Sequence, residues 1–199
     1  MNFIVTGFNQ KYWNPWGISW ISSLIEIANT KSQLVVVNYG LKESIKEFLE
    51  SKKIITVEKK PCKNLRNDTL ATIIDLSNQQ VGNYAYYDTD CWFQLNPDEI
   101  FEHLDNKLVM TQNKNHGFMA GSHKSWQKFE TISKMTKSLK DDKPIPCLLN
   151  YFANDVNFID NKFKGWNCSV NWFFLFIRQI DGEVFVNKDC KMRFDGTVG

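Results

Sequence analysis

The sequence lacks a long apolar run and an excess of either charge. Its longest unbroken apolar stretch, residues 172–177, has six residues, whereas a membrane-spanning helix needs about 20. Its 24 basic and 22 acidic residues are interspersed and leave a formal net charge of +2, unlike the strongly basic surfaces that bind nucleic acids. We therefore expect no transmembrane segment and no nucleic-acid partner.

Paired cysteine motifs are absent as well. The five cysteines are an odd number, and the sequence contains no CxxC pair and no cluster of cysteine with histidine. This pattern argues against a structural zinc site and favours reduced thiols in a cytosolic protein. The opening residues, MNFIVTGFNQ, also lack the charged start and long apolar core of a signal peptide. The expected location is cytoplasmic.

What the sequence does contain is an alternation of strand-like and helix-like segments. Its 43% of hydrophobic residues is enough for a real core, and no linker or repeat is visible, so we expect one domain over residues 1–199. Near the amino terminus, three apolar or β-branched runs are separated by two amphipathic patterns. The expected strands cover residues 3–5, 34–37 and 54–57, and the expected helices cover residues 17–28 and 42–50. This β-α-β-α-β order predicts right-handed crossovers and a mostly parallel α/β sheet.

Further segments extend the pattern toward the carboxyl terminus. Asn96 is a favourable N-cap, and Pro97 suits the first position of a helix. Near the end, Asp181-Gly182 separates two strand-like runs and predicts a β-hairpin. The other expected elements are strands at 84–87 and 108–111 and helices at 69–76, 123–135 and 148–153.

Two aspartates, Asp88 and Asp90, follow the aromatic strand expected at residues 84–87. In open α/β sheets, ligands bind beyond the carboxyl ends of the strands. Neighbouring carboxylates there offer the hard oxygen ligands that Mg²⁺ and Mn²⁺ prefer. The alternative is an Asx-turn, in which Asp88 bonds to nearby backbone N–H groups. An isolated Asp-x-Asp motif favours the second interpretation, so the surrounding sequence has to decide.

The surrounding sequence resembles the nucleotide-sugar glycosyltransferases with the GT-A fold, most closely glycosyltransferase family 8. The resemblance covers nearly the whole chain and rests on the shared order and spacing of short segments. These segments are FIVTGFNQKYW, VVVNYGLKES, YAYYDTDCWFQLNPDEIF, NHGFMAGSHKSW, LLNYF, GWN and RFDGT. The resemblance implies a Rossmann-like, three-layer α/β fold with a mostly parallel central sheet, which the predicted hairpin would follow at the carboxyl end.

The resemblance also implies an activity and a set of site residues. The expected enzyme transfers a hexose-class sugar from a nucleotide-diphosphate sugar, with UDP as the expected nucleotide, and retains the anomeric configuration. The acceptor would be a glycan, a lipid-linked molecule or a protein. Asp88 and Asp90 would hold Mn²⁺ or Mg²⁺ and assist departure of the diphosphate, while Asn115 and Gly117 would line the sugar and acceptor site. Contacts to the nucleotide and donor would come from Thr6, Gly7, Asn9, Tyr12, Arg66 and Arg193.

Several of these assignments have alternatives. Arg193 stands where the family's third metal ligand, a histidine, is expected, and an arginine has no free lone pair for a metal. Either Arg193 contacts the diphosphate or Asp195 takes the ligand position. Lys63 and Arg66 are the candidates for the basic residue at the donor sugar. Arg66 is preferred for its planar fork, and the alternative is that Arg66 is a solvated surface arginine. A Pro-Cys pair at 146–147 replaces the family's Asp-Gln pair, so that pair's role is not carried over.

Two other functions fit parts of the sequence. A strand followed by DTD also resembles the phosphatases of the haloacid dehalogenase superfamily, in which the first aspartate is the nucleophile. There, the motif normally opens the chain and continues with Gly-Thr, whereas here it continues with Cys-Trp. The second alternative is a module that binds a nucleotide sugar or a glycan without turnover, because a fold alone does not determine function.

Overall fold

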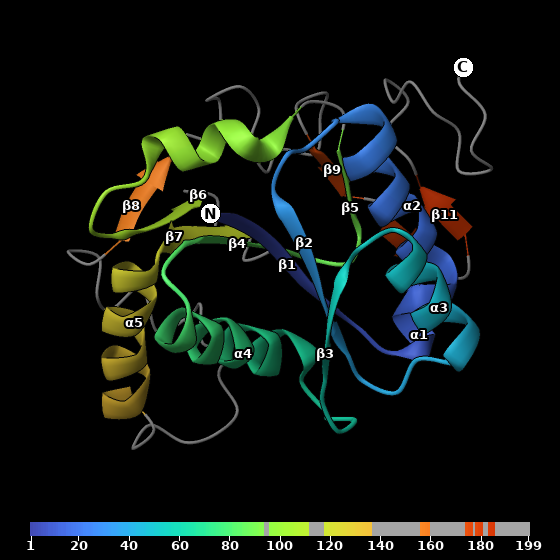
Figure 1. Cartoon of the computed structure of the whole chain (residues 1–199), viewed down its shortest axis with the longest axis horizontal. Coiled ribbons are helices and arrows are strands. Elements are labelled where there is room, and N and C mark those ends of the chain that lie inside the picture. Colours follow the sequence, from blue (N-terminus) through green and yellow to red (C-terminus); the bar gives the residue numbers. More distant parts are fainter. Residues whose placement is uncertain are drawn as a thin grey trace.

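The computed structural model describes residues 1–93, 96–111, 118–136, 156–159, 174–176, 178–180 and 183–185. Within these residues, a sheet of seven strands runs through the molecule in the order β3-β2-β1-β4-β7-β6-β8 (Figure 1). Pairing is parallel from β3 to β4 and between β6 and β8, whereas β7 pairs antiparallel with β4 and β6. The strands are β1 (Asn2–Phe8), β2 (Gln33–Asn38), β3 (Ile55–Glu58), β4 (Asn83–Tyr87), β6 (Leu108–Thr111), β7 (Phe118–Ser122) and β8 (Val156–Ile159).

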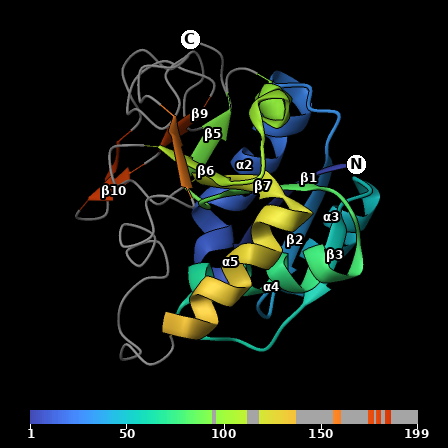
Figure 2. The ribbon, with the colours of Figure 1, turned by 90° about the vertical axis from the view of Figure 1, so that its left-hand side faces the viewer.

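Helices cover both faces of this sheet. One face carries α4 (Leu65–Gln79) and α5 (His123–Thr136), which pack side by side (Figure 2). The other face carries α3 (Glu43–Ser51) and the helical segment that follows β1. That segment consists of α1 (Gln10–Tyr12), the π-helical turn η1 (Trp13–Gly17), α2 (Ile18–Ser22) and the π-helical turn η2 (Ser23–Ile27). The expected three-layer α/β fold with a mostly parallel sheet is therefore confirmed.

Alternation along the strands produces a hydrophobic core on each face of the sheet. In β1, Ile4 and Phe8 pack with the helical segment after that strand, whereas Phe3 and Val5 pack toward α4. Each core contains a fully buried tryptophan, Trp20 on one face and Trp126 on the other. Burying such a side chain contributes roughly 4 kcal/mol, so these two residues are major anchors of the layers.

The helical segment after β1 begins earlier than expected. Asn9 has an extended backbone, and its side chain accepts a hydrogen bond from the backbone N–H of Tyr12 (3.0 Å), which caps α1. The expected start near Gly17 is wrong because Pro15 does not end the helix. A proline removes only one backbone donor, and the wide turn η1 spans it.

Several elements differ from the expected pattern between β4 and the carboxyl end. β7 occupies residues that we expected to form a loop, because Ala120 and Gly121 have low strand propensity; burial between β4 and β6 overrides that preference. The helix capped by Asn96 is the 3₁₀ helix η3 (Pro97–His103). β5 (Cys91–Phe93) pairs antiparallel with β9 (Phe174–Phe176), a pairing that the sequence analysis did not predict.

The expected carboxyl-terminal hairpin is confirmed as β10 (Arg178–Ile180) paired with β11 (Glu183–Phe185). The helix expected at 148–153 lies outside the described residues. Across the part of the chain that the structure describes, no helix combines the length and the apolar character that a bilayer span requires.

Candidate functional site

The candidate site lies at the carboxyl edge of the parallel strands. The strand order places β2, β1 and β4 side by side, so the residues after these strands share one edge of the sheet. The chain proceeds from β1 outward to β2 and β3 and then returns to the other side of β1 with β4. This reversal is the topological switch point at which open α/β sheets bind ligands. Asp88 follows β4 directly at this point.

Strand alternation directs Asp88 toward α4. Tyr84 and Tyr86 pack in the core on the α4 face, and successive side chains of a strand point to opposite faces, so Asp88 continues their side. Arg66, in the first turn of α4, meets it there. The guanidinium donates from Nε to Asp88 Oδ1 (3.1 Å) and from Nη2 to Oδ2, and the Tyr86 hydroxyl also donates to Oδ1.

This ion pair is partly shielded from water. The side chain of Asp88 is 17% exposed and that of Arg66 is 34% exposed. Burial by itself lowers the pKa of the Arg66 guanidinium, but the charge of Asp88 and its hydrogen bonds raise that pKa above its ordinary value overall. Arg66 is therefore a permanent cation. The interpretation of Arg66 as a solvated surface residue does not fit this geometry.

The loop after β4 is held by its backbone. The Asp88 carbonyl accepts hydrogen bonds from the indole Nε1 of Trp20 (3.1 Å) and from the backbone N–H of Cys91 (3.3 Å). Trp20 also packs edge-to-face on Phe93, with ring centroids 5.7 Å apart. Burial, together with the charges of Asp90 and Asp88, raises the pKa of the Cys91 thiol well above its ordinary value. Cys91 is thus a protonated, buried side chain and not an activated nucleophile.

A second polar cluster fixes the start of α4. The hydroxyl of Tyr39, just after β2, donates to Asp68 Oδ2 (2.8 Å) and lies 3.1 Å from Thr69 Oγ1. Gly7 permits this approach, because a Cβ there would overlap Thr69 Oγ1 and lie 2.8 Å from Cε2 of Tyr39. We did not expect Tyr39, Asp68 or Thr69 at the site from the sequence. The cluster holds the helix turn that carries Arg66.

The residues expected to contact the nucleotide differ in how far they are exposed at this edge of the sheet. Asn9 caps α1 and Tyr12 is 40% exposed, so both are near the surface beyond β1. Thr6 is completely buried on β1, and Gly7 is buried against α4. Arg66 is brought to Asp88, as described above. Three further expected site residues, Asn115, Gly117 and Arg193, lie outside the described residues, and their roles stay predictions.

Asp88 and Asp90 fit a divalent metal ion in the kind of ligand atom they offer. The fit is reduced at Asp88, because a carboxylate has about four acceptor positions and three hydrogen bonds from Arg66 and Tyr86 already reach this one. Among the described residues, no group of three His, Cys, Asp or Glu side chains is arranged to hold a metal ion.

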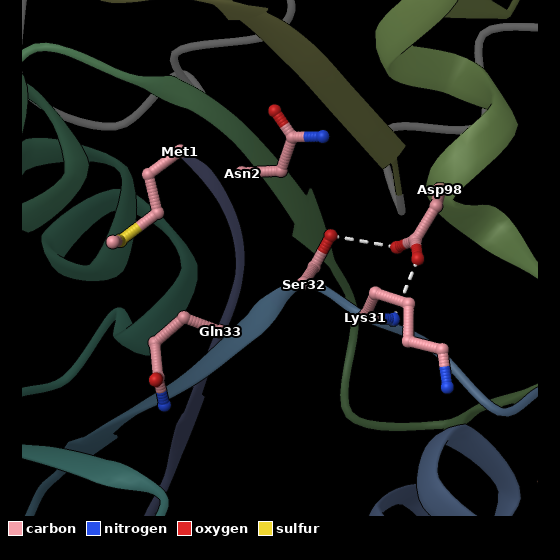
Figure 3. A pocket seen from close by; sticks show the side chains of 6 residues that line it. All are labelled: Met1, Asn2, Lys31, Ser32, Gln33 and Asp98. Atoms are coloured by element: carbon pink, nitrogen blue, oxygen red, sulfur yellow. Dashed lines mark hydrogen bonds between the residues drawn. The ribbon is translucent and has the colours of Figure 1, made fainter.

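A pocket of about 260 Å³ lies at the opposite edge of the sheet, by the amino ends of β1 and β2 (Figure 3). There, the Asp98 carboxylate accepts hydrogen bonds from the Thr30 hydroxyl (2.5 Å), the Lys31 backbone N–H (2.6 Å) and the Ser32 hydroxyl (2.6 Å). This arrangement ties η3 to the loop that enters β2 and is structural. The lining residues are Met1, Asn2, Lys31, Ser32, Gln33 and Asp98.

No protein-family model and no curated protein sequence matches the chain. Solved structures do match it. The galactosyltransferase LgtC, in complex with donor and acceptor sugar analogs, matches with a TM-score of 0.58 and 13% identity over 82% of this chain and 74% of LgtC. The glycosyltransferase GlyE of Streptococcus pneumoniae TIGR4 matches with a TM-score of 0.53 and 14% identity, over 81% of this chain and 46% of GlyE.

Mouse xyloside xylosyltransferase 1 matches with a TM-score of 0.56 and 8% identity, over 80% of this chain and 84% of that protein. The likeness to these three proteins is a likeness of fold. The chain therefore has the GT-A fold of glycosyltransferases, as the resemblance in sequence implied. Membership of glycosyltransferase family 8 stays a prediction.

Proposed function

We propose that the protein is a glycosyltransferase that moves a sugar from a nucleotide-diphosphate sugar to an acceptor. The observation that carries this proposal is the position of Asp88, at the switch point of a fold shared with enzymes that transfer sugars. LgtC was solved with donor and acceptor sugar analogs, which supports a donor and an acceptor site here. UDP is the proposed nucleotide, and a glycan, a lipid-linked molecule or a protein is the proposed acceptor.

The described residues support specific roles in this reaction. Arg66 supplies a fixed positive charge at the edge of the sheet where a diphosphate would leave, and Asp88 orients its fork. Asn9 and Tyr12 would contact the nucleotide beyond β1. Asp88 and Asp90 would hold Mn²⁺ or Mg²⁺, which when bound acts as a Lewis acid toward the departing diphosphate.

The proposal also includes the finer expectations from the sequence. Transfer would retain the anomeric configuration, through an oxocarbenium-like state of the sugar. Residues 1–199 would act as one domain, in the cytoplasm. The stereochemical outcome can be read from the coupling constant of the anomeric proton, by NMR of the product before it equilibrates.

A thermal-shift panel tests the donor class. Purified protein is heated with UDP, GDP, CDP and UDP-sugars, each with and without Mn²⁺. A nucleotide at 100 times its Kd adds about 2.7 kcal/mol of stability, which raises the Tm of a protein of this size by roughly 5–10 °C. UDP and UDP-sugars are expected to raise the Tm by this amount.

The increase in Tm that depends on Mn²⁺ should vanish in Asp90→Ala. The control is Asp75→Ala, which changes an aspartate paired at the surface with Lys59. Lack of stabilisation by any nucleotide would refute the proposal.

A module that binds a nucleotide sugar without turnover is the second candidate. The pairing of Asp88 with Arg66 favours it, because the ion pair leaves Asp88 with fewer acceptor positions for a catalytic metal ion. Chromatography of UDP-sugars incubated with the protein separates the two candidates. Slow release of UDP supports the transferase, because enzymes of this kind can pass the sugar to water. Tight binding with the donor left intact, even when acceptor sugars are added, supports the binding module. A phosphatase of the haloacid dehalogenase type is not proposed further, since the fold is that of glycosyltransferases.

A further inference from the structure

The Asp-x-Asp motif carries an internal cation in this structure. Arg66 donates hydrogen bonds to both carboxylate oxygens of Asp88. The hydroxyl of the buried Tyr86 donates a second hydrogen bond to Oδ1. The pair Arg66–Asp88 is therefore electrically neutral as a unit. A divalent cation binds through carboxylate oxygens that are open to coordination. Arg66 therefore already neutralises Asp88, one of the two carboxylates that the motif would offer to a metal ion.

We propose that Arg66 is the resident counter-ion of Asp88 and competes with a divalent metal ion for that carboxylate. The inference deepens the proposed function, because it concerns how the same site takes up its metal. The competition has a geometric basis: the guanidinium fork and a metal ion would use the same oxygens. It also has an electrostatic basis, because a metal at Asp88 would lie beside the positive charge of an arginine.

The competition predicts coupling between the metal and an anionic ligand. A nucleotide diphosphate offers Arg66 alternative acceptor oxygens, and each Arg66 donor that turns to the phosphates frees an acceptor position on Asp88. Binding of the diphosphate should then strengthen binding of the metal. By linkage, the metal strengthens binding of the diphosphate by the same factor.

Titration with Mn²⁺ alone tests the competition directly, with free Mn²⁺ measured by electron paramagnetic resonance. Arg66→Met should bind Mn²⁺ at least about tenfold more tightly than the unchanged protein, which corresponds to about 1.4 kcal/mol. The control is Lys63→Met, which removes one positive charge from an exposed side chain three residues earlier and should change the Kd less than twofold. In Arg66→Met/Asp88→Asn, the gain should disappear.

Arg66→Met will be less stable than the unchanged protein, because the mostly buried carboxylate of Asp88 loses its counter-ion. A second variant is therefore included. Arg66→Gln keeps a hydrogen-bond donor for Asp88 without the charge and should also bind Mn²⁺ more tightly. In both variants Mn²⁺ should raise the Tm more than in the unchanged protein. If the folded variants bind Mn²⁺ no more tightly than the unchanged protein, or if the gain survives Asp88→Asn, the inference is wrong.

Adding UDP separates this inference from the proposed function. With UDP present, the unchanged protein should bind Mn²⁺ several-fold more tightly, and this coupling should shrink in Arg66→Gln. If UDP does not bind at all, the proposed donor fails while the titration with Mn²⁺ alone still decides whether Arg66 competes. If UDP binds and the coupling is equal in both proteins, the proposed donor stands and the role of Arg66 is refuted.

Discussion

Replacing Gly7 by alanine should lower the free energy of unfolding by about 2 kcal/mol. The new Cβ would overlap Thr69 Oγ1 and lie 2.8 Å from Cε2 of Tyr39, and both neighbours belong to the cluster at the start of α4. Overpacking of this kind costs about 1–3 kcal/mol. The reduced freedom of alanine in the unfolded chain returns about 0.4–1 kcal/mol. Because two neighbours are displaced together, we expect the overpacking cost to lie near the upper end of its range.

Gly40→Ala is the matched control for this prediction. Gly40 has a φ of +88°, and a Cβ there would meet its nearest neighbour, Pro61 Cγ, at 3.6 Å, which is an ordinary contact. Its cost is therefore backbone strain alone, about 1–2 kcal/mol. Thr69→Ala in combination with Gly7→Ala removes the closest overlap. The double variant should be at least about 0.5 kcal/mol more stable than the sum of the two single effects predicts.

Urea unfolding followed by tryptophan fluorescence measures these differences, because Trp20 and Trp126 report on the two cores. If Gly7→Ala costs less than about 0.5 kcal/mol, or if Thr69→Ala adds its full loss to that of Gly7→Ala, the packing role is refuted. UDP affinity tests the other role of Gly7. Affinity that is unchanged in folded Gly7→Ala supports packing, whereas loss of UDP binding at nearly unchanged stability would support Gly7 as a nucleotide contact.

Three further predictions concern other parts of the fold. Thr6→Val should raise the free energy of unfolding by about 1 kcal/mol in the same urea assay, since the buried Thr6 hydroxyl has no hydrogen-bond partner among the described residues; a loss of stability would contradict this. Asp98→Ala should lower it by about 2 kcal/mol and Asp98→Asn by less, because three donors lose their charged acceptor; equal, negligible effects would contradict this. Burial raises the pKa of Tyr86 and of Tyr87 well above 10, so their contribution to stability is complete below pH 10 and declines above it, as only the unfolded state loses these protons. Each tyrosine then costs up to about 1.4 kcal/mol per pH unit, and a Tm that stays constant from pH 9 to pH 11 would contradict this.

The parallel part of the sheet could be predicted because the sequence of each strand is by itself typical of a buried strand. The run Leu34–Val37 is apolar and β-branched, as strands covered on both faces are, and Asp88 was placed correctly at the end of β4. β7 could not be predicted in this way. Its Ala120 and Gly121 favour no strand, and its place depends on pairing with β4, which precedes it by more than thirty residues.

The candidate site shows the same division between local and distant interactions. The two aspartates are a local pattern, and the sequence predicted them as site residues. The cap at Asn9 is also local, but Asn9 was expected to contact a nucleotide, and the helix was expected to begin near Gly17. Arg66 was assigned to the donor from its fork geometry alone. Its partner is 22 residues away in sequence, on another element, and it meets Asp88 only because α4 packs on the face of β4 that carries Tyr86.

The pairing of Asp88 with Arg66 changes what the motif implies about a metal. A carboxylate beside buried aromatic residues needs a compensating charge, and in the sequence an external metal ion is the obvious source. The structure supplies a source within the chain, so the fold does not depend on a metal to offset Asp88. Under the proposed function, metal dependence would then be a property of the ligand-bound state, in which a diphosphate would compete with Asp88 for Arg66. The Asp-x-Asp motif predicts where the site lies, whereas Arg66, the residue that faces Asp88, would determine under the proposal when a metal can bind.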